Sequence, residues 1–482
     1  MIHILLVNWL KKMADTNSHN NKALKINLDD TVFGTFAEIG GGQETSAMFF
    51  RVGGASGTVA KTICAYHKSF SDSLYNQGNK SGRYVSEGRL RKMLEKEYAE
   101  LDLHLAKQDE SSQRIFAFAN TVETINFRKD NQGHGWVGIR FRLESSGNIN
   151  DVILHVNLHE KESVQQQITL GILGVNLIYG VYHYASQPEV LLKSLMDNIP
   201  ADSLEINMIR MEGPDFQHVD NRILSVQLVK NGMTPLAIFD RNGNTQQPGD
   251  MLYKKHVLLL RGSFRPITYA GFDMLKTGYS LMKKELQTDK NNSLVFCEMT
   301  LDNLLEKGSF NERDFLDRVD LLNGMGQNVM ISRFREFYRL TDYLSNIKIS
   351  NLRLIIGAET LLKLTEKKYY KDLKGGILEA FGRLFLNNVK MYVYPSIIEE
   401  KNLLLTSENI PVRVSEKNLY KYILSNGQIM DITDYKMKFL YCSSHKVLDL
   451  LIKNDNNWET MVPVYISEHI RKNNLFGCND CK

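Results

Sequence analysis

Val257-Leu-Leu-Leu-Arg261 is the stretch that decides the fold class. It is a short apolar run that ends in a charged residue, and Leu294-Val-Phe-Cys-Glu298 repeats this pattern after the amphipathic segment Phe272–Leu286. Short apolar runs are typical of strands that are buried on both faces, and a helix between two of them is typical of a βαβ crossover. The pattern therefore predicts a mainly parallel sheet covered by helices.

The alternation continues on both sides of this stretch. Further strand candidates are Leu236–Phe239, Val329–Ser332, Leu352–Ile356 and Lys390–Tyr394. Further helix candidates are Glu312–Leu322, Phe334–Leu344, Thr360–Lys367 and Ile377–Phe385. We expect a domain of repeated βα units over residues 201–395, in a sheet that is either open or closed into a barrel. Residues 396–482 are more polar and are expected to form a small C-terminal appendage.

Residues 24–200 predict a different, α+β domain with a helical first part. Leu24–Leu28 alternates like a short strand, and Thr58–Tyr75 has helical spacing. Three later segments are rich in β-branched and aromatic residues: Ile115–Thr121, Trp136–Leu143 and Val152–Leu158. These segments predict an antiparallel meander. The fold class is therefore α/β, with a helical N-terminal part, a meander and then βα repeats.

A long apolar helix is expected at Ser163–Tyr184. Its glycines Gly171, Gly174 and Gly180 are spaced so that a neighbouring backbone can approach closely.

The charge balance, the cysteines and the lack of long apolar stretches favour a cytoplasmic protein without a nucleic-acid partner or a transmembrane helix. The 482 residues carry 59 Lys and Arg against 55 Asp and Glu, and this balance is too weak to indicate a nucleic-acid partner. The five cysteines are thinly spread, which favours a reducing compartment and a cytoplasmic location. No stretch is long and apolar enough to predict a transmembrane helix. Residues 1–23, with Met13 as an alternative start, are expected to form a tail outside the fold.

Glycine-rich turns are the first candidate sites. The turns comprise Gly40, Gly41 and Gly42, then Gly53, Gly54 and Gly57, and finally Gly375 and Gly376. Each is expected to lead into a helix N-terminus, where backbone N–H groups favour a phosphate or another anion. Lys61 follows the second turn, but its spacing differs from that of a P-loop. The alternative interpretation is that these glycines allow tight turns and close helix packing.

His155, Asn157 and His159 fall on one face of an expected strand. Strand positions four apart are separated by about 13 Å, too far for two imidazoles to bind one metal ion. We therefore expect a solvated strand face and no metal site.

Polar residues at the ends of the expected parallel strands form the main candidate site. Ligands bind at this edge in parallel α/β folds. The predicted anion-binding residues are Arg261, Arg265, Asn303 and Ser332, and the predicted catalytic residues are Glu298, Arg333 and Glu359. Arginines bind phosphate or carboxylate in a bidentate manner, and a glutamate can act as general base. The alternative is that these residues cap helices and pair with one another.

Several stretches resemble one bacterial family, from about Leu24 to Phe476. They are Phe36-Ala-Glu-Ile-Gly-Gly-Gly-Gln-Glu44, Gly57-Thr-Val-Ala-Lys-Thr62, Leu252-Tyr-Lys-Lys255, Arg261-Gly-Ser-Phe-Arg-Pro266 and Gly376-Ile-Leu-Glu-Ala-Phe-Gly-Arg-Leu-Phe385. Members of this family carry the names TonB-dependent receptor or nicotinate-nucleotide adenylyltransferase. The chain shows neither the export signal and alternating barrel strands of the first nor the His-x-Gly-His turn of the second. Gly133-His134-Gly135 comes nearest to that turn but lacks its second histidine.

The leading hypothesis is an enzyme that acts on a phosphorylated or nucleotide-like small metabolite. The competing hypothesis is a non-catalytic scaffold or regulatory protein that uses the α/β body to bind a partner. The sequence indicates no particular cofactor, and it leaves the substrate, the reaction and the oligomeric state open.

Overall fold

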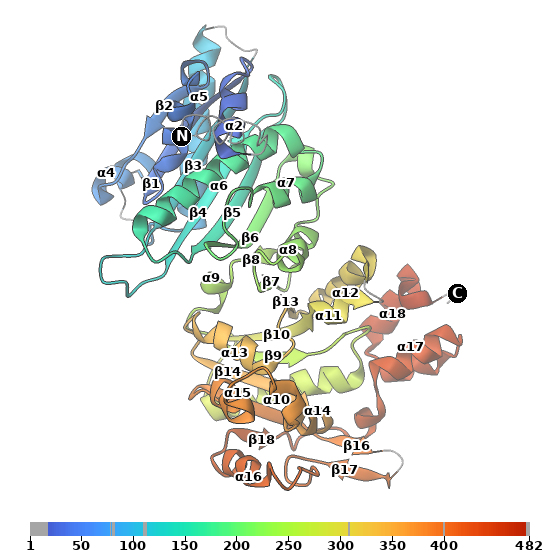
Figure 1. Cartoon of the computed structure of the whole chain (residues 1–482). Helices are drawn as coiled ribbons and strands as arrows, with labels where there is room; N and C mark the ends of the chain where they lie inside the picture. Colours follow the sequence, from blue (N-terminus) through green and yellow to red (C-terminus); the bar gives the residue numbers. More distant parts are fainter. Residues whose placement is uncertain are drawn as a thin grey trace, which may run out of the picture. The chain divides into compact units, whose positions relative to one another are not determined.

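The computed structural model describes residues 18–77, 79, 82–108, 113–306, 309–398 and 401–478. The chain forms two compact units, Met1–Thr234 (unit 1) and Pro235–Lys482 (unit 2), each with its own sheet (Figure 1). We expected the division between residues 200 and 201. It falls after Thr234, because strand β6 (Leu204–Glu212) and helix α8 (Asn221–Lys230) pack within unit 1. Among the described residues, no helix has the length and apolar character needed to cross a membrane.

Unit 1 is built on a six-stranded sheet in the order β2-β1-β3-β4-β5-β6. The strands other than β6 are β1 (Val32–Gly40), β2 (Val59–Ile63), β3 (Arg114–Glu123), β4 (Gly133–Phe141) and β5 (Asn150–Leu158). β1 runs parallel to both β2 and β3, whereas β3 to β6 form consecutive antiparallel pairs. The predicted antiparallel meander is therefore confirmed, and it has a fourth strand, β6.

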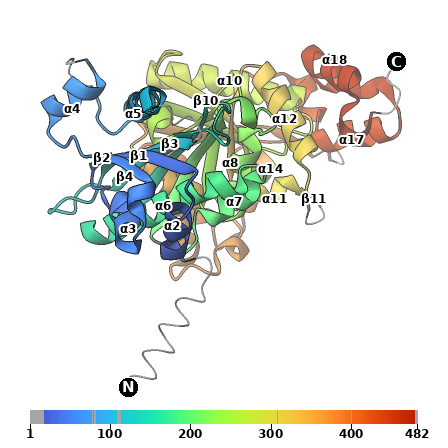
Figure 2. The same ribbon diagram turned by 90° about the horizontal axis from the view of Figure 1, so that it is seen from above.

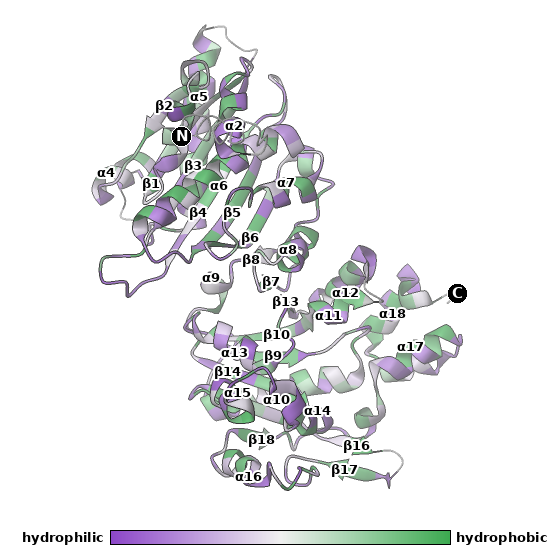
Figure 3. Cartoon of the chain, in the orientation of Figure 1, coloured by the Kyte–Doolittle hydropathy of each residue, from purple (hydrophilic) through white to green (hydrophobic). Residues whose placement is uncertain are grey.

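Helices cover both faces of this sheet. They are α2 (His19–Asn27), α3 (Glu44–Val52), α4 (Lys68–Tyr75), α5 (Glu87–Gln108), α6 (Ser163–Tyr184), α7 (Pro188–Ser194) and α8. Helices α2, α3, α6, α7 and α8 contribute to the larger apolar core, whereas α4 and α5 pack against the other face (Figure 2). Hydrophobic residues run along α6 and the strands that it covers (Figure 3). Because successive side chains of a strand point to opposite faces, the strands contribute side chains to two separate cores.

Two predictions for the first hundred residues were wrong. Leu24–Asn27 belongs to helix α2, of which Leu28 is the C-cap, and Lys22 and Ile26 are buried on one face of this helix at a spacing of four residues. This helix also starts inside the stretch 1–23 that we expected to lie outside the fold, while residues 1–17 lie outside the described residues. Thr58–Tyr75 is not one helix, because Val59–Ile63 pairs with β1 as an edge strand and α4 starts only at Lys68.

Unit 2 contains an open eight-stranded sheet in the order β18-β15-β14-β9-β10-β13-β7-β8. The strands are β7 (Leu236–Phe239), β8 (Thr245–Gln246), β9 (His256–Arg261), β10 (Ser293–Thr300), β13 (Asn328–Ser332), β14 (Asn351–Gly357), β15 (Val389–Tyr394) and β18 (Ile429–Asp431). The run from β18 to β13 is parallel, whereas β7 and β8 are antiparallel to their neighbours. The predicted, mainly parallel sheet is confirmed, and it is open. Its edge strand β18 comes from the segment expected to be an appendage.

Unit 2 also contains helices, several of which pack against this sheet. They are α9 (Pro248–Leu252), α10 (Tyr269–Leu286), α11 (Leu301–Leu304), α12 (Glu312–Gly324), α13 (Phe337–Ser345), α14 (Ala358–Leu364), α15 (Gly376–Leu384), α16 (Lys417–Ser425), α17 (Ser444–Ile452) and α18 (Val464–Asn473). Short antiparallel pairs are formed by β11 (Leu305–Glu306) with β12 (Ser309–Phe310) and by β16 (Ser396–Ile398) with β17 (Leu403–Leu405).

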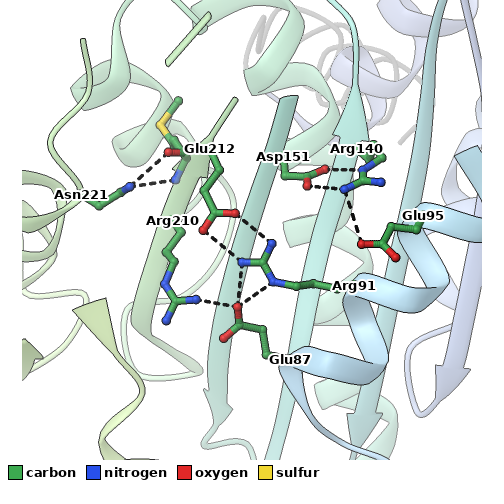
Figure 4. Close-up of polar contacts among 9 residues, drawn as sticks. Glu87, Arg91, Glu95, Arg140, Asp151, Arg210, Glu212 and Asn221 are labelled. Atoms are coloured by element: carbon green, nitrogen blue, oxygen red, sulfur yellow. Dashed lines mark hydrogen bonds and ion pairs between the residues drawn. The ribbon is translucent and has the colours of Figure 1, made fainter. Parts of the chain in front are cut away.

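The face of the unit 1 sheet that α5 covers also carries ion pairs between this helix and the strands. Arg91 of α5 contacts Glu87 of the same helix and both carboxylate oxygens of Glu212 on β6 (Figure 4). Arg140 of β4 binds Asp151 of β5 in a bidentate manner, with both N–O distances at 2.8 Å. Arg140 also lies 3.9 Å from a carboxylate oxygen of Glu95 on α5. These contacts link α5 to β6 and β4, and β4 in turn to β5.

The predicted close approach to helix α6 is confirmed at two of its three glycines. A Cβ atom on Gly174 would lie 2.3 Å from Oγ1 of Thr45 and 2.8 Å from the ring of Phe118, and Gly171 meets α3 equally closely. At Gly180 the nearest atoms would be 3.4 Å away, which is ordinary van der Waals contact. Helix α3 therefore packs on α6 only because two positions lack side chains.

Gly174→Ala is expected to lower the free energy of unfolding of unit 1 by about 1–3 kcal/mol, since the added methyl group overpacks the contact between α3 and α6. Gly180→Ala is the matched control, and it should be neutral or stabilising by up to about 1 kcal/mol because alanine favours the helix. Hydrogen exchange measured by mass spectrometry on peptides of α3 and α6 reports the difference. Equal effects of the two substitutions would contradict the close packing.

Candidate functional site

A cavity of about 880 Å³ opens in unit 1 where the parallel strands β1 and β3 end. Its walls come from six places: the β1 end (Ile39, Gly40, Gly41) with Gln43, residues 121–126, His134 at the start of β4, Tyr66, Lys68 and Ser71 near α4, residues 83–85 before α5, and Ser163 and Gln167 of α6. Cavities of roughly 300–1,000 Å³ are typical of small-molecule sites, and the carboxyl ends of parallel strands are where such sites form in α/β folds.

The buried carboxylate of Glu38 fixes the turn on one side of the cavity. It accepts hydrogen bonds from the backbone N–H groups of Thr45 and Ser46, each at 3.1 Å, and from the Ser46 hydroxyl at 2.6 Å. The amide of Asn120 on β3 donates to Glu38 at 3.2 Å and to the carbonyl of Gly42 at 2.7 Å. Burial raises the pKa of Glu38, and the bonds from Ser46 and Thr45 oppose this effect. One carboxylate thus joins β1, the N-terminus of α3 and β3.

The first glycine turn packs directly on β3. Gly40 has φ +87°, and a Cβ atom there would lie 1.9 Å from the carbonyl oxygen of Val122, while one on Gly42 would lie 2.5 Å from the Asn120 side chain. These contacts require glycine. Helix α3 follows the turn as expected, but two of its terminal N–H groups are already bonded to Glu38. The anion site predicted at Gly40, Gly41 and Gly42 stays a prediction, and its turn does line the cavity.

Two histidines meet beneath the cavity. His155 is buried, contrary to the expected solvated strand face, because its side of the sheet also carries Trp136, whose ring packs edge-on against it at 4.9 Å. Nδ1 of His155 lies 2.8 Å from Oδ1 of Asn207, and its Nε2 lies 3.3 Å from Nδ1 of His134. Burial lowers the pKa of His155 from 6.5 to about 3. His134 lines the cavity, and its Nε2 lies 4.0 Å from a carboxylate oxygen of Glu123.

Charged and aromatic side chains form the rim of the cavity. Lys68 and Arg83 are exposed cations, and Glu123 is an exposed carboxylate. The ammonium group of Lys68 lies 5.6 Å from the ring centre of Tyr84, whose hydroxyl donates to Asp72 at 2.8 Å. The rim therefore has two cations against one anion.

The second glycine turn lies elsewhere in unit 1. Gly53 and Gly54 have positive φ values of 84° and 75°, and the turn containing Gly57 leads into strand β2 rather than into the expected helix. Lys61 pairs with Glu97 of α5. Of the described residues, those of this turn and Lys61 do not line the cavity.

In unit 2 the structure brings together three of the residues predicted at strand ends. Arg261 binds the fully buried carboxylate of Glu298 through two N–O contacts of 2.9 and 2.8 Å. The Ser332 hydroxyl donates to the same carboxylate at 2.6 Å. The guanidinium group of Arg261 also lies 4.1 Å from the ring centre of Phe337. These groups satisfy one another, as the alternative interpretation expected.

The other predicted strand-end residues of unit 2 do not join this cluster. Arg265 pairs with Asp314 of α12 at 2.7 Å, and Asn303 donates to a backbone carbonyl just past β9. Arg333 and Glu359 have exposed side chains, after β13 and in the first turn of α14 respectively.

The third glycine turn, Gly375 and Gly376, is bonded to the helix that follows it. The N–H group of Gly375 donates to the carboxylate of Glu379 at 2.9 Å, and Gly376 opens α15 with φ +55°. A side chain of the helix itself thus takes the N–H group that we expected to face an anion.

Gly40 and Gly41 are the residues of the cavity that the sequence predicted as site residues, and its charged and aromatic residues were missed. Lys68, Arg83, Tyr84 and His134 come from segments that are separate in the sequence and belong to no known motif. The only available signal was the pair of glycines flanking His134, which we had compared with an adenylyltransferase turn. Strand β4 runs antiparallel to β3 and starts beside the end of β3. His134, at the start of β4, therefore lies at the edge of the sheet where β1 and β3 end.

No protein-family model and no curated protein sequence matches the chain. Several solved structures are similar to part of the chain, and two of them each have a TM-score of 0.22. The competence/damage inducible protein CihA from Agrobacterium tumefaciens shares 17% identity over 33% of this chain and 88% of its own length. A competence-damaged protein (CinA) superfamily protein from Escherichia coli shares 14% identity over 34% of this chain and 87% of its own.

Glu38→Gln is expected to lower the free energy of unfolding of unit 1 by about 1–3 kcal/mol, because the new NH₂ group faces a backbone N–H donor and leaves it unsatisfied. Glu44→Gln is the matched control. Its carboxylate pairs with the exposed Arg51, and its loss should cost less than about 1 kcal/mol. Amide exchange at Thr45 and Ser46 measures the effect, and unchanged exchange in Glu38→Gln would show that the carboxylate does not hold the turn.

Unit 1 should lose stability as the pH falls below 6.5, the ordinary pKa of histidine. The unfolded chain then binds a proton at His155, whereas the folded unit, with a pKa of about 3, does not. Between pH values of about 6.5 and 5 the loss is about 2 kcal/mol. His155→Gln should remove this part of the pH dependence, and His104→Gln, an exposed position on α5, should not. Urea unfolding, monitored by hydrogen exchange in peptides of β5, gives the free energy of unfolding at each pH. The same dependence of this free energy on pH in the parent chain and in both variants would contradict the prediction.

Proposed function

We propose that this chain is an enzyme acting on a small anionic metabolite, phosphorylated or nucleotide-like, which unit 1 binds in the cavity at the ends of β1 and β3. The observation that carries the proposal is the cavity of about 880 Å³ itself, because it combines cations, aromatic rings and a histidine at one place. Such a combination of concave shape and convergent polar groups is the usual mark of a small-molecule site.

The charges of the rim favour an anion. Lys68 and Arg83 lie on the rim, and Glu123 is the acidic side chain beside them. Arginine binds phosphate oxygens in a bidentate manner, and lysine supports it as a compact charge. A phosphate group between these two side chains would be bound by charge-assisted hydrogen bonds.

The aromatic residues favour a ligand with a ring. Tyr66 lines the cavity although 72% of its surface is exposed. Tyr84 also lines it; in the sequence, Tyr66 precedes α4 and Tyr84 follows it. Exposed aromatic rings provide stacking surfaces for a nucleobase, an interaction worth about 1–3 kcal/mol per base. Cations and rings together therefore support a nucleotide-like ligand over inorganic phosphate alone.

A second function, that of a scaffold or regulatory body, is favoured for unit 2. Arg261, Glu298 and Ser332 are bonded to one another at the strand ends where we had predicted a site. Binding a ligand there would first require breaking an ion pair whose carboxylate is fully buried, at a cost of about 3–5 kcal/mol. Unit 2 is thus better suited to rigid support or partner binding than to catalysis at this place.

Lys68→Ala and Arg83→Ala are each expected to weaken the binding of adenosine monophosphate roughly tenfold or more, because each removes a charged hydrogen-bond donor. Thermal shifts measured against ligand concentration give the affinities. Adenosine and inorganic phosphate, tested separately, should bind more weakly than the monophosphate.

Lys193→Ala, on α7, is the control in unit 1, and the combined variant Arg333→Ala, Glu359→Ala, at two exposed predicted site residues, is the control in unit 2. Both should keep the affinity of the parent chain. Loss of binding in the unit 2 variant alone would move the site to the strand ends of unit 2 and contradict the proposal.

A further inference from the structure

We propose that His134 is the proton acceptor of the unit 1 cavity, and that His155 and Asn207 are positioning residues that fix its tautomer. The role toward a ligand rests on the proposed function. The tautomers themselves are a property of the free protein, so the two ideas can fail separately.

The chain of hydrogen bonds begins at Asn207. Its side-chain oxygen Oδ1 lies 2.8 Å from Nδ1 of His155, and both side chains are buried. An amide oxygen only accepts hydrogen bonds, so the proton of the His155 ring must be on Nδ1. The opposite tautomer would set two lone pairs against each other at 2.8 Å. The second nitrogen of His155, Nε2, is therefore left with a lone pair.

The second step passes from His155 to His134. Nε2 of His155 lies 3.3 Å from Nδ1 of His134. Since Nε2 of His155 is an acceptor, Nδ1 of His134 must carry the donated proton. The edge-on contact of Trp136 with the His155 ring keeps that ring in the required orientation. Nε2 of His134 therefore carries a lone pair when the ring is neutral.

The environment of His134 suits the uptake of a proton at Nε2. Its side chain is 23% exposed, lines the cavity and has Nε2 4.0 Å from the carboxylate of Glu123. Among the charged and titratable groups near the pair, Arg83 opposes protonation of His155, which burial keeps neutral. A positive charge on His134 is thus matched by Glu123, while a second charge on His155 is disfavoured.

The chemical step is a proton transfer. An O–H or N–H bond of the bound metabolite, or of a water molecule beside it, breaks, and an N–H bond forms at Nε2 of His134. The imidazole becomes imidazolium next to Glu123, and the donor atom gains the negative charge, which Lys68 and Arg83 on the rim can stabilise. A base whose orientation is fixed by a third group is the general arrangement of such sites.

The test is long-range ¹H–¹⁵N NMR of the histidine rings in the full chain. The chain has 12 histidines, so the signals are assigned by their loss in His134→Gln and His155→Gln. At neutral pH both rings should carry their proton on Nδ1, and on acidification His134 should be protonated on Nε2 before His155 gains a second proton. A proton on Nε2 of either ring at neutral pH would overturn the inference.

Substitution of Asn207 separates a positioning role from a structural one. Asn207→Leu removes the acceptor and should convert His134 at least partly to the Nε2–H tautomer, whereas Asn207→Asp keeps an acceptor and should retain the original tautomers. Unchanged tautomers in a folded Asn207→Leu protein would contradict the role of Asn207. If Asn207→Leu does not fold, the spectra of the parent chain and of Asn207→Asp still show whether both histidines carry their proton on Nδ1, as the inference requires.

Adenosine monophosphate is the probe for the ligand. Its addition should shift the Nε2 signal of His134 and leave Nδ1 of His155 unchanged. Bound nucleotide without any shift at His134 would contradict its role as proton acceptor. Absence of nucleotide binding with both tautomers as stated would instead contradict the proposed function.

Discussion

The carboxylate of Glu38 is the contact on which the candidate site depends. It is buried at the end of β1, where it accepts two backbone N–H groups of α3 and the side chain of Asn120 on β3. Because Asn120 also holds the carbonyl of Gly42, the glycine turn is fixed to both neighbouring elements. Without this carboxylate, the N-terminus of α3 and the wall of the cavity would each have unsatisfied donors.

The same edge of the sheet combines two different strand arrangements. β1 and β3 are parallel and end there, whereas β4 is antiparallel and starts there. The glycine turn, the end of β3 and His134 therefore meet although they lie far apart in the sequence. The buried pair of His155 and Asn207 continues this polar arrangement into the interior of unit 1. In unit 2 the charged side chains at the corresponding strand ends, Arg261 and Glu298, are bonded to each other, an arrangement that supports the structure and leaves neither group available to a ligand.

The sequence predicted the fold class better than the site. Apolar runs and helix-length spacings were sufficient for the meander and for the parallel sheet, since both depend on local periodicity, and Gly171 and Gly174 mark the approach of α3. The early strand β1 was missed because its glycines obscure the alternation. Of the cavity, the sequence predicted only the glycine turn, because the order of the strands in the sheet is what brings the other lining residues to it. Strand-end position alone does not tell a side chain that binds a ligand from one that, like Arg261, binds its neighbour.

The central claim is that the ligand site lies in the cavity of unit 1. Hydrogen exchange by mass spectrometry, compared with and without adenosine monophosphate, tests this claim most directly because it reports on both units at once. The account predicts slower exchange in peptides that contain Gly40 and Gly41, Lys68, and the β3–β4 connection up to His134. Protection confined to peptides around Arg261, Glu298 and Ser332 in unit 2 would contradict it.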